Sequence, residues 1–338
     1  MKKAMNSHKT QTIDRRLWLK AGALSLGGAY STISLPLGAQ DGWPARPVKL
    51  IVSSSPGGGT DLYARMLAQA LGDVFKQQFV VENRPGASGN IGAAAVAKSP
   101  PDGYTFLVSA NTSLTINGSL FKNLSYEAER DFVPIMRAFA PLVLVVHPAT
   151  KARSLAELID LGKRDPGKVS FGSAGTGSTT DLGVRMLEEK TGARFLHVPY
   201  KGVGPAYQDL LAGQLNFLFP DVASALSLIK AGKIIPIASE QRTPLLPGLP
   251  TVSEAGVADV STNSSFSLVA PTGTPSAVVD RIHRELVAIT KSAAFAAKLE
   301  SQGLVGEVDS LSALAASMKK ERESYAAFIK RNGIVASD

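Results

Sequence analysis

The feature of this sequence that most constrains its fold is a glycine-rich turn between a strand and a helix, which occurs twice. In the first copy, apolar residues at 48–52 precede the turn and the octapeptide TDLYARML at 60–67 follows it. In the second copy, 168–171 precede the turn and TDLGVRML at 180–187 follows it. Solenoid repeats recur several times with a period of about 20–50 residues. A single duplication of this kind therefore predicts two similar α/β lobes, each built from a strand, a turn and a helix.

Each turn would present backbone N–H groups to a ligand. Glycines let the chain pass close to a ligand, and a helix N-terminus carries unpaired N–H donors at the positive end of the helix dipole. Neither turn fits the commoner phosphate motifs. No Gly-Lys-Ser/Thr follows Gly57-Gly58-Gly59, and Thr180 stands where a dinucleotide-binding loop has its third glycine. An ordinary turn with no ligand is the alternative interpretation.

Asp61 and Asp181 hold matching positions in the two helices, and each has an arginine four residues later, Arg65 and Arg185. In one interpretation each aspartate caps its own helix and pairs with its arginine on the surface. In the other, the charged side chains contact a ligand directly. The sequence leaves both open.

Charge and composition narrow the class of protein. Five of the eight net positive charges lie in residues 1–39, where six Lys and Arg residues accompany one Asp. Without this leader the chain is only weakly basic, and it has no run of Lys and Arg interleaved with aromatic residues, so we expect no nucleic-acid partner. The absence of cysteine excludes disulfides and thiolate metal sites. A length of 338 residues suggests about two domains.

The leader predicts export. Asp14-Arg15-Arg16-Leu17-Trp18-Leu19-Lys20 resembles a twin-arginine motif, and a weakly apolar run follows at 21–37. We expect residues 1–39 to be a signal peptide cleaved after Ala39, and the mature protein to be periplasmic. A membrane anchor is the alternative, but glycines and a proline interrupt the run too often for a good spanning helix.

The remaining chain alternates strands with helices. Strands are expected at 79–83 and 104–108. The ligand crevice of an open α/β sheet lies beyond the carboxyl ends of its strands, so the segment Ser109-Ala110-Asn111-Thr112 is a candidate lining segment, with an ordinary surface loop as the alternative. Extended apolar runs at 142–148 and 266–271 predict two chain crossings between the lobes, and hence a hinge. Further helices are expected at 155–163, 275–290 and 314–331; the last would return to the first lobe or pack across the back.

Several motifs, taken together and in order, resemble the Bug-type periplasmic solute receptors of tripartite tricarboxylate transporters. They are VENRPGA at 81–87, GNIG at 89–92, DGYT at 102–105, HVPYKG at 197–202, LLAGQ at 210–214, LPTVSEAG at 249–256 and APTGTP at 270–275. The resemblance implies a type II periplasmic-binding-protein fold, in which two α/β lobes joined by a two-crossing hinge close on a small carboxylate. It implies lobe 1 at 40–141 and 266–338, and lobe 2 at 142–265. It also implies membrane transporter subunits as partners, and we expect a monomer with no cofactor and no bound metal.

The resemblance marks the two glycine loops as the ligand clamp, although the family often has His where this chain has Asp181. Tyr200 either bonds the ligand or closes the core, and Lys201 is a competing source of positive charge. The full set of candidate ligand-binding residues is Ser55, Pro56, Gly57, Gly58, Gly59, Thr60, Asp61, Asn111, Ala174, Gly175, Thr176, Gly177, Ser178, Asp181, Tyr200, Lys201 and Asp221.

Enzyme functions find little support. None of His147, His197 and His283 has a second histidine at metal-ligand spacing, and no Gly-x-Ser-x-Gly nucleophile elbow occurs. We expect His197 to be a strand residue with a hydrogen-bonded ring, and we expect no catalysis. The alternatives are a ligand-sensing receptor without transport and a hydrolase or transferase with an unfamiliar site.

Overall fold

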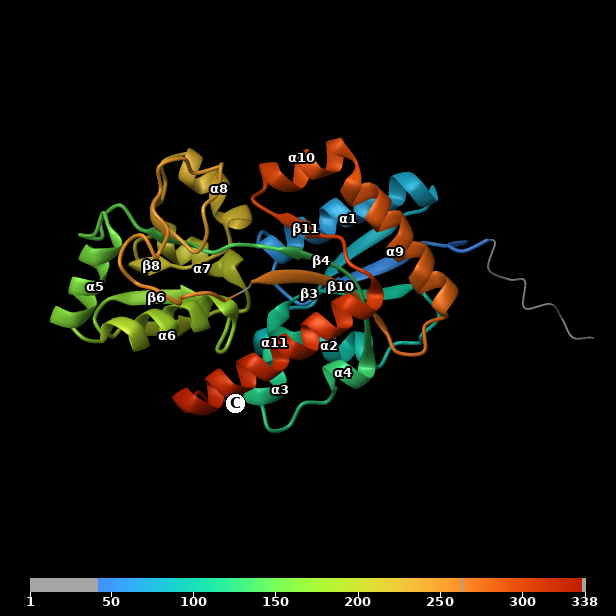
Figure 1. Ribbon diagram of the computed structural model, residues 1–338, viewed down its shortest axis with the longest axis horizontal. Helices are drawn as coiled ribbons and strands as arrows, with labels where there is room; N and C mark the ends of the chain where they lie inside the picture. Colours follow the sequence, from blue (N-terminus) through green and yellow to red (C-terminus); the bar gives the residue numbers. More distant parts are fainter. Residues whose placement is uncertain (1–41, 263, 336–338) are drawn as a thin grey trace, which may run out of the picture. The chain divides into compact units, whose positions relative to one another are not determined.

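The computed structural model describes residues 42–262 and 264–335. Within these residues the strands form a six-stranded sheet in the order β11-β4-β10-β3-β1-β2 and a five-stranded sheet in the order β7-β6-β8-β5-β9. Each sheet and its helices make one lobe (Figure 1), as the duplicated turn predicts. The predicted leader at 1–39 and its cleavage site lie outside the described residues.

Lobe 1 contains the glycine turn that follows its first strand. Its strands are β1 (Val48–Val52), β2 (Phe79–Asn83), β3 (Thr105–Ala110), β4 (Phe132–Phe139), β10 (Ser265–Pro271) and β11 (Val305–Glu307). Its helices are α1 (Gly59–Phe75), η1 (Ala87–Gly89), α2 (Asn90–Ala97), η2 (Thr112–Ile116), α3 (Asn117–Leu120), α4 (Ala128–Asp131), α9 (Ser276–Lys291), α10 (Ala293–Ser301) and α11 (Leu311–Asn332). β1 pairs in parallel with β2 and β3, whereas β10 runs antiparallel to β3 and β4.

The sheet of lobe 1 is covered on both faces. Leu50 of β1 packs in one core cluster with Leu67 of α1 and Ile282 of α9. The next residue, Ile51, packs in another cluster with Leu314 of α11. Because successive strand residues point to opposite faces, a strand between two helix layers needs consecutive apolar residues. In β1 these are Leu50–Val52, which are buried, whereas Lys49 near the start of the strand is exposed.

Lobe 2 repeats the arrangement on a smaller scale. Its strands are β5 (Val143–Val146), β6 (Ser170–Ser173), β7 (Leu196–Pro199), β8 (Phe217–Leu218) and β9 (Ile235–Ser239). Its helices are α5 (Leu155–Arg164), α6 (Thr179–Thr191), α7 (Val203–Leu211) and α8 (Val222–Lys230). Leu144 packs with α5 and α6 in one cluster, and Val145 packs with α7 and α8 in another.

Two connections join the lobes, between β4 and β5 and between β9 and β10. The lobe boundaries at 141/142 and 265/266 stay predictions, and the second of them lies inside β10. The carboxylate of Glu240, just after β9, bonds to both connections. It accepts a hydrogen bond from the N–H of Leu142 in the first, at 3.1 Å, and from the N–H of Thr262 in the second. The run at 266–271 is itself part of β10, a fully buried strand between β3 and β4, so the second crossing precedes it.

The C-terminal helix α11 contacts both lobes. It lies along lobe 1 and reaches toward α6 (Figure 1). Its residues Tyr325, Phe328 and Ile329 share an apolar cluster with Leu182 of α6. Tyr325 also donates a hydrogen bond to the carbonyl of Thr262 at the second connection. The helix therefore returns to the first lobe, as one of the two predicted placements has it, and also contacts the second.

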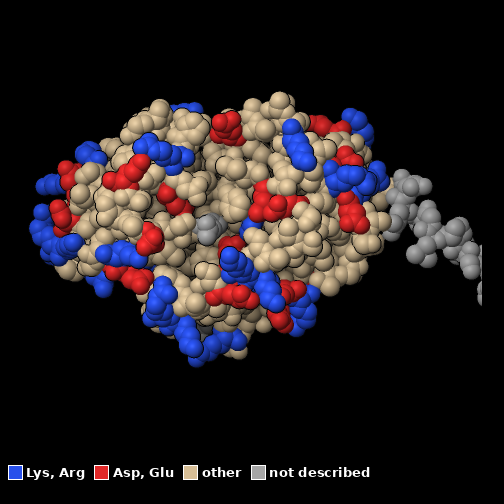
Figure 2. All heavy atoms as spheres, in the orientation of Figure 1, with Lys and Arg blue, Asp and Glu red and all other residues tan. Residues whose placement is uncertain are grey.

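Across 42–262 and 264–335, every helix is too short or too polar to cross a bilayer. On the face shown in Figure 2, basic and acidic side chains are interspersed.

Candidate functional site

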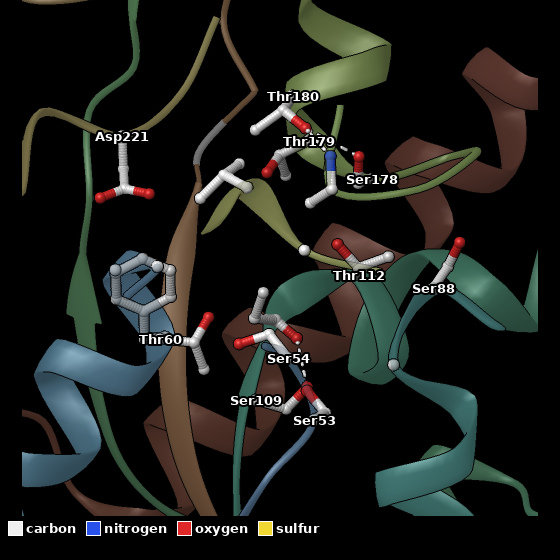
Figure 3. A pocket seen from close by; sticks show the side chains of 18 of the residues that line it. Ser53, Ser54, Thr60, Ser88, Ser109, Thr112, Ser178, Thr179, Thr180 and Asp221 are labelled. Atoms are coloured by element: carbon white, nitrogen blue, oxygen red, sulfur yellow. Dashed lines mark hydrogen bonds between the residues drawn. The ribbon is translucent and has the colours of Figure 1, made fainter. Parts of the chain in front are cut away.

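A pocket lies between the lobes, at the carboxyl ends of β1, β3 and β6 (Figure 3). Its wall is made mostly of glycines and of serine and threonine side chains. The lining residues are Ser53, Ser54, Gly58, Gly59, Thr60, Gly86, Ser88, Gly89, Ser109, Ala110, Thr112, Ala174, Ser178, Thr179, Thr180, Lys201, Gly202, Val203, Asp221, Ser264 and Phe266. Of the predicted site residues, Gly58, Gly59, Thr60, Ala174, Ser178, Lys201 and Asp221 are in this wall.

Lobe 1 contributes the N-terminus of α1. Gly58 occupies the N-cap position, and because it has no side chain it supplies no cap hydrogen bond. Within the described residues, the structure gives the N–H of Thr60 no hydrogen-bond partner. The first N–H groups of a helix are unpaired by geometry, so this donor is available to a ligand in the pocket. Ser54, at the end of β1, adds a buried hydroxyl that also lacks a protein partner among the described residues.

Lobe 2 contributes the N-terminus of α6 in the matching place. Here the N-cap residue Ser178 accepts a hydrogen bond from the N–H of Asp181. The Thr180 hydroxyl accepts from the N–H of Ala174 at 2.8 Å, which holds the turn against the helix. In the described part of the chain, the N–H groups of Thr179 and Thr180 have no protein partner. Two helix N-termini from opposite lobes therefore offer free donors to one pocket.

The two aspartates adopt the same local arrangement. Asp61 accepts the N–H of Gly57 at 3.1 Å and the Arg65 guanidinium at 3.0 Å. Asp181 accepts the N–H of Gly177 at 2.8 Å and Arg185 at 2.9 Å. Each carboxylate thus ties the turn to its helix, as in the capping interpretation. Neither residue is in the pocket wall, and direct ligand contact stays a prediction for both.

The environment of Asp61 favours its ionised form. Burial acts to raise its pKa, but hydrogen bonds from Arg65, the N–H of Gly57 and Asn83 outweigh burial, and the pKa lies below its usual 3.8. Asp61 is 3% exposed, whereas the Arg65 side chain that donates to it is 54% exposed, so solvent screens this ion pair in part. Asp61 therefore stabilises the loop in its charged form.

The loops of the two lobes contact each other directly. Ser55 donates its hydroxyl to the carbonyl of Lys201 at 2.6 Å, and Ser88 donates to the carbonyl of Thr176 at 2.8 Å. Glycines permit this approach: a Cβ on Gly204 of α7 would lie closer than 3.0 Å to the carbonyl oxygen of Pro56. The described lobes are thus apposed around the pocket.

The other predicted residues lie beside the pocket. Pro56 and Gly57 are exposed at the loop, whereas Gly175 and Gly177 approach Ser88 and Leu120 of lobe 1 closely.

Two predicted polar side chains bond to protein groups. Asn111 donates to Glu321 of α11 at 2.6 Å, and the Tyr200 hydroxyl donates to Asp209 within lobe 2 at 2.5 Å. Ligand contact by these side chains stays a prediction.

Sequence reasoning placed Ser109 and Thr112 of the wall in a candidate lining segment, but it did not select the hydroxyl groups of Ser88, Thr179, Thr180 and Ser264. Ser53, just after β1, and Ser109, near the end of β3, bond each other at 2.7 Å. Ser264 and Phe266 come from the second connection and β10. Serines at the ends of strands were a usable signal for the first pair, but no local pattern marks the second pair, because β10 reaches the pocket only through the sheet order.

Three side chains of lobe 2 have the spatial arrangement of a hydrolase catalytic triad: those of Ser173, His197 and Asp181. His197 Nε2 is 2.6 Å from Ser173 Oγ, and Nδ1 is 3.7 Å from Asp181 Oδ1. Ser173, however, is 0% exposed, and its hydroxyl also bonds the Gly175 carbonyl at 3.1 Å. A nucleophile must reach its substrate, so this cluster is structural. Burial lowers the pKa of His197, and the prediction of a strand residue with a hydrogen-bonded ring is confirmed.

Within residues 42–262 and 264–335, no group of three or more His, Asp or Glu side chains is placed to hold a metal ion.

Comparisons with known proteins agree with this architecture. The family described as "Tripartite tricarboxylate transporter family receptor" matches residues 63–333. Protein BugT of Bordetella pertussis is 37% identical over 279 residues, which cover 81% of this chain and 85% of BugT.

Two solved structures resemble the whole described fold. An R. palustris protein solved with adipate has a TM-score of 0.84 at 33% identity, covering 87% of this chain and 100% of that one. The periplasmic binding protein BugD has a TM-score of 0.83 at 32% identity, with the same coverage. These likenesses confirm the predicted periplasmic-binding-protein fold of two α/β lobes. The chain belongs to the family of tripartite tricarboxylate transporter receptors.

Proposed function

We propose that this protein is a periplasmic receptor that captures a small carboxylate between its lobes and delivers it to the membrane subunits of a tripartite tricarboxylate-type transporter. The observation that carries the proposal is the convergence of unpaired N–H groups, from Thr60 in lobe 1 and from Thr179 and Thr180 in lobe 2, on one pocket. Helix N-termini are suited to anions because their N–H donors and dipole both favour negative charge.

The donors are sufficient for useful affinity. A hydrogen bond to a charged oxygen is worth about 1.5–3 kcal/mol, and micromolar binding corresponds to about 8 kcal/mol. Three N–H groups and the Ser54 hydroxyl therefore reach this range before the cost of ordering the ligand is subtracted. The Lys201 side chain in the wall adds positive charge but is exposed, so its contribution is screened by solvent.

The relatives support a carboxylate ligand and a periplasmic location. One similar protein was solved with adipate, and another is described as a periplasmic binding protein. In this proposal Arg15 and Arg16 direct export by the twin-arginine route, and the mature receptor acts as a monomer without catalysis. The ligand clamp consists of the loops at 55–61 and 173–181. Asp61 and Asp181 stabilise these loops by accepting the N–H groups of Gly57 and Gly177.

A thermal-shift screen tests the proposal. The purified mature chain is heated with succinate, malate, adipate, glutamate, benzoate and neutral sugars. A ligand at 100 times its dissociation constant adds about 2.7 kcal/mol of stability, which raises the melting temperature by several degrees. We expect at least one acid, and no sugar, to give this shift. Stabilisation by sugars alone would refute the carboxylate proposal.

A further inference from the structure

Ser88 belongs to a turn of lobe 1 that has an unusual backbone. The residues Gly86, Ala87, Ser88 and Gly89, between β2 and α2, all have positive φ angles, of 124°, 46°, 52° and 90°. Glycine adopts such angles freely, but a residue with a Cβ does so at a cost and keeps them only where its surroundings hold it. Residues of this kind are concentrated at ligand clamps, and Ser88 lies in the pocket wall (Figure 3).

Contacts with both lobes hold Ser88 in this conformation. Its carbonyl accepts a hydrogen bond from the side-chain amide of Asn117, a fully buried residue of lobe 1, at 3.0 Å. Its hydroxyl donates to the carbonyl of Thr176 in lobe 2 at 2.8 Å. A Cβ on Gly175 would lie closer than 3.0 Å to Ser88 Oγ, so glycine at this position allows the two loops to meet. The turn therefore directs one hydroxyl group to the opposite lobe.

This hydroxyl is not available as a donor to a captured acid. A serine side chain has a single O–H hydrogen, and in Ser88 the Thr176 carbonyl accepts it. The oxygen can still accept a hydrogen bond, but an ionised carboxylate has no hydrogen to donate. Ser88 thus lies in the pocket wall while its hydrogen bond joins the lobes.

A second serine contact between the lobes depends less on its side chain. The hydroxyl and the N–H of Ser55 both donate to the carbonyl of Lys201, at 2.6 Å and 3.2 Å. The main-chain bond of this pair would remain if the Ser55 hydroxyl were removed. The bond from Ser88 to Thr176 is made by the side chain, so a substitution at Ser88 removes it completely.

We propose that Ser88 is a positioning residue of the ligand site: its hydroxyl holds the loop before α6 against lobe 1 and so determines how fast a captured acid is released. The proposal rests on the proposed function and deepens it. The bond joins atoms of different lobes, so it is present when the lobes are apposed and lost when they separate. Its removal shifts the equilibrium toward separated lobes, and an acid held between them dissociates sooner.

Two substitutions separate the hydroxyl group from the backbone of the turn. Ser88→Ala keeps a Cβ on the left-handed backbone but removes the hydroxyl. Ser88→Gly removes the hydroxyl and also the cost of the positive φ angle. The matched control is Ser99→Ala, which removes a hydroxyl bond of equal length, 2.8 Å, to the carbonyl of Val96 within lobe 1.

Stopped flow measures the release of the acid from the named panel that gives the largest thermal shift. We expect both Ser88 variants to release it about three- to tenfold faster than wild type, the loss expected for one hydrogen bond between neutral groups, and Ser99→Ala to stay within about twofold. Release from Ser88→Ala at the wild-type rate would overturn the proposal, whatever Ser88→Gly does.

A ligand-free measurement distinguishes a bond between the lobes from a contact with the ligand. The chain has no cysteine, so Val80→Cys and Leu196→Cys place spin labels at exposed positions on β2 and β7, the edge strands of the two sheets. We expect the distances between the labels to become longer in both Ser88 variants and to stay unchanged in Ser99→Ala. Wild-type distances in the Ser88 variants would overturn the proposal, even if release were faster. If wild type binds no acid, the proposed function fails, while these distances still test the bond between the lobes.

Discussion

The substitution Gly204→Ala should weaken ligand binding without weakening the fold. Gly204 lies in the first turn of α7, and the three atoms nearest to an added Cβ all belong to Ser55 and Pro56 of lobe 1. The nearest is a backbone carbonyl oxygen, closer than 3.0 Å, which cannot swing aside as a flexible side chain would. The new methyl group therefore clashes with lobe 1 when the lobes are apposed, and the clash is absent when the lobes separate.

The magnitudes follow from these contacts. Replacing glycine by alanine at a compatible backbone position stabilises a protein by about 0.4–1 kcal/mol. Overpacking a close contact costs about 1–3 kcal/mol, which corresponds to about 5- to 150-fold in a dissociation constant. The ligand-free melting temperature should therefore stay the same or rise slightly, while the affinity for the captured acid falls by at least fivefold.

Calorimetric titration with that acid measures the affinity, and small-angle scattering measures how far the lobes close. The matched control is Gly118→Ala in α3, where an added Cβ meets nothing within 4 Å, and which should bind as wild type does. If Gly204→Ala binds with wild-type affinity and becomes equally compact with ligand, the lobes do not meet at Pro56 in the bound state. The reasoning would then be wrong.

Three other predictions follow from the same contacts and from the leader. Asp61→Asn should reduce the free energy of unfolding by about 1 kcal/mol at pH 7. Because the pKa of Asp61 is depressed in the folded protein, this difference between wild type and variant should shrink as the pH falls below 3.8. Urea denaturation of both proteins at pH 7 and at pH 3 measures it. Replacing Arg15 and Arg16 by lysine should leave uncleaved precursor in the cytoplasm, and unchanged export in a fractionation assay would indicate the general secretory route. Lys201→Ala should weaken binding less than tenfold in the same titration, since its exposed charge is screened; a complete loss of binding would assign the anion site to this side chain.

Local sequence patterns were enough to predict most elements of the fold. The turns that open α1 and α6 consist of consecutive residues whose glycines and amphipathic helices can be recognised without tertiary information. The same holds for β1, whose consecutive apolar residues 50–52 are typical of a strand that helices cover on both faces.

The composition of the pocket wall was harder to predict. Asp221 was predicted as a ligand-binding residue, yet its close approach to Gly59 joins residues from opposite lobes, and no local pattern encodes it. Phe266 reaches the pocket because β10 lies next to β3 in the sheet, an order that no single segment specifies. Tyr200 has a side chain suited to a ligand, but a partner nine residues later, Asp209, takes its hydroxyl.

The central claim is that main-chain N–H groups at two helix N-termini hold the ligand's carboxylate. A crystal structure with the acid that gives the largest thermal shift tests it most directly. The account predicts carboxylate oxygens within about 3.2 Å of the amide nitrogens of Thr60, Thr179 and Thr180. A carboxylate bound to the Lys201 ammonium, with these three amides facing water, would contradict it.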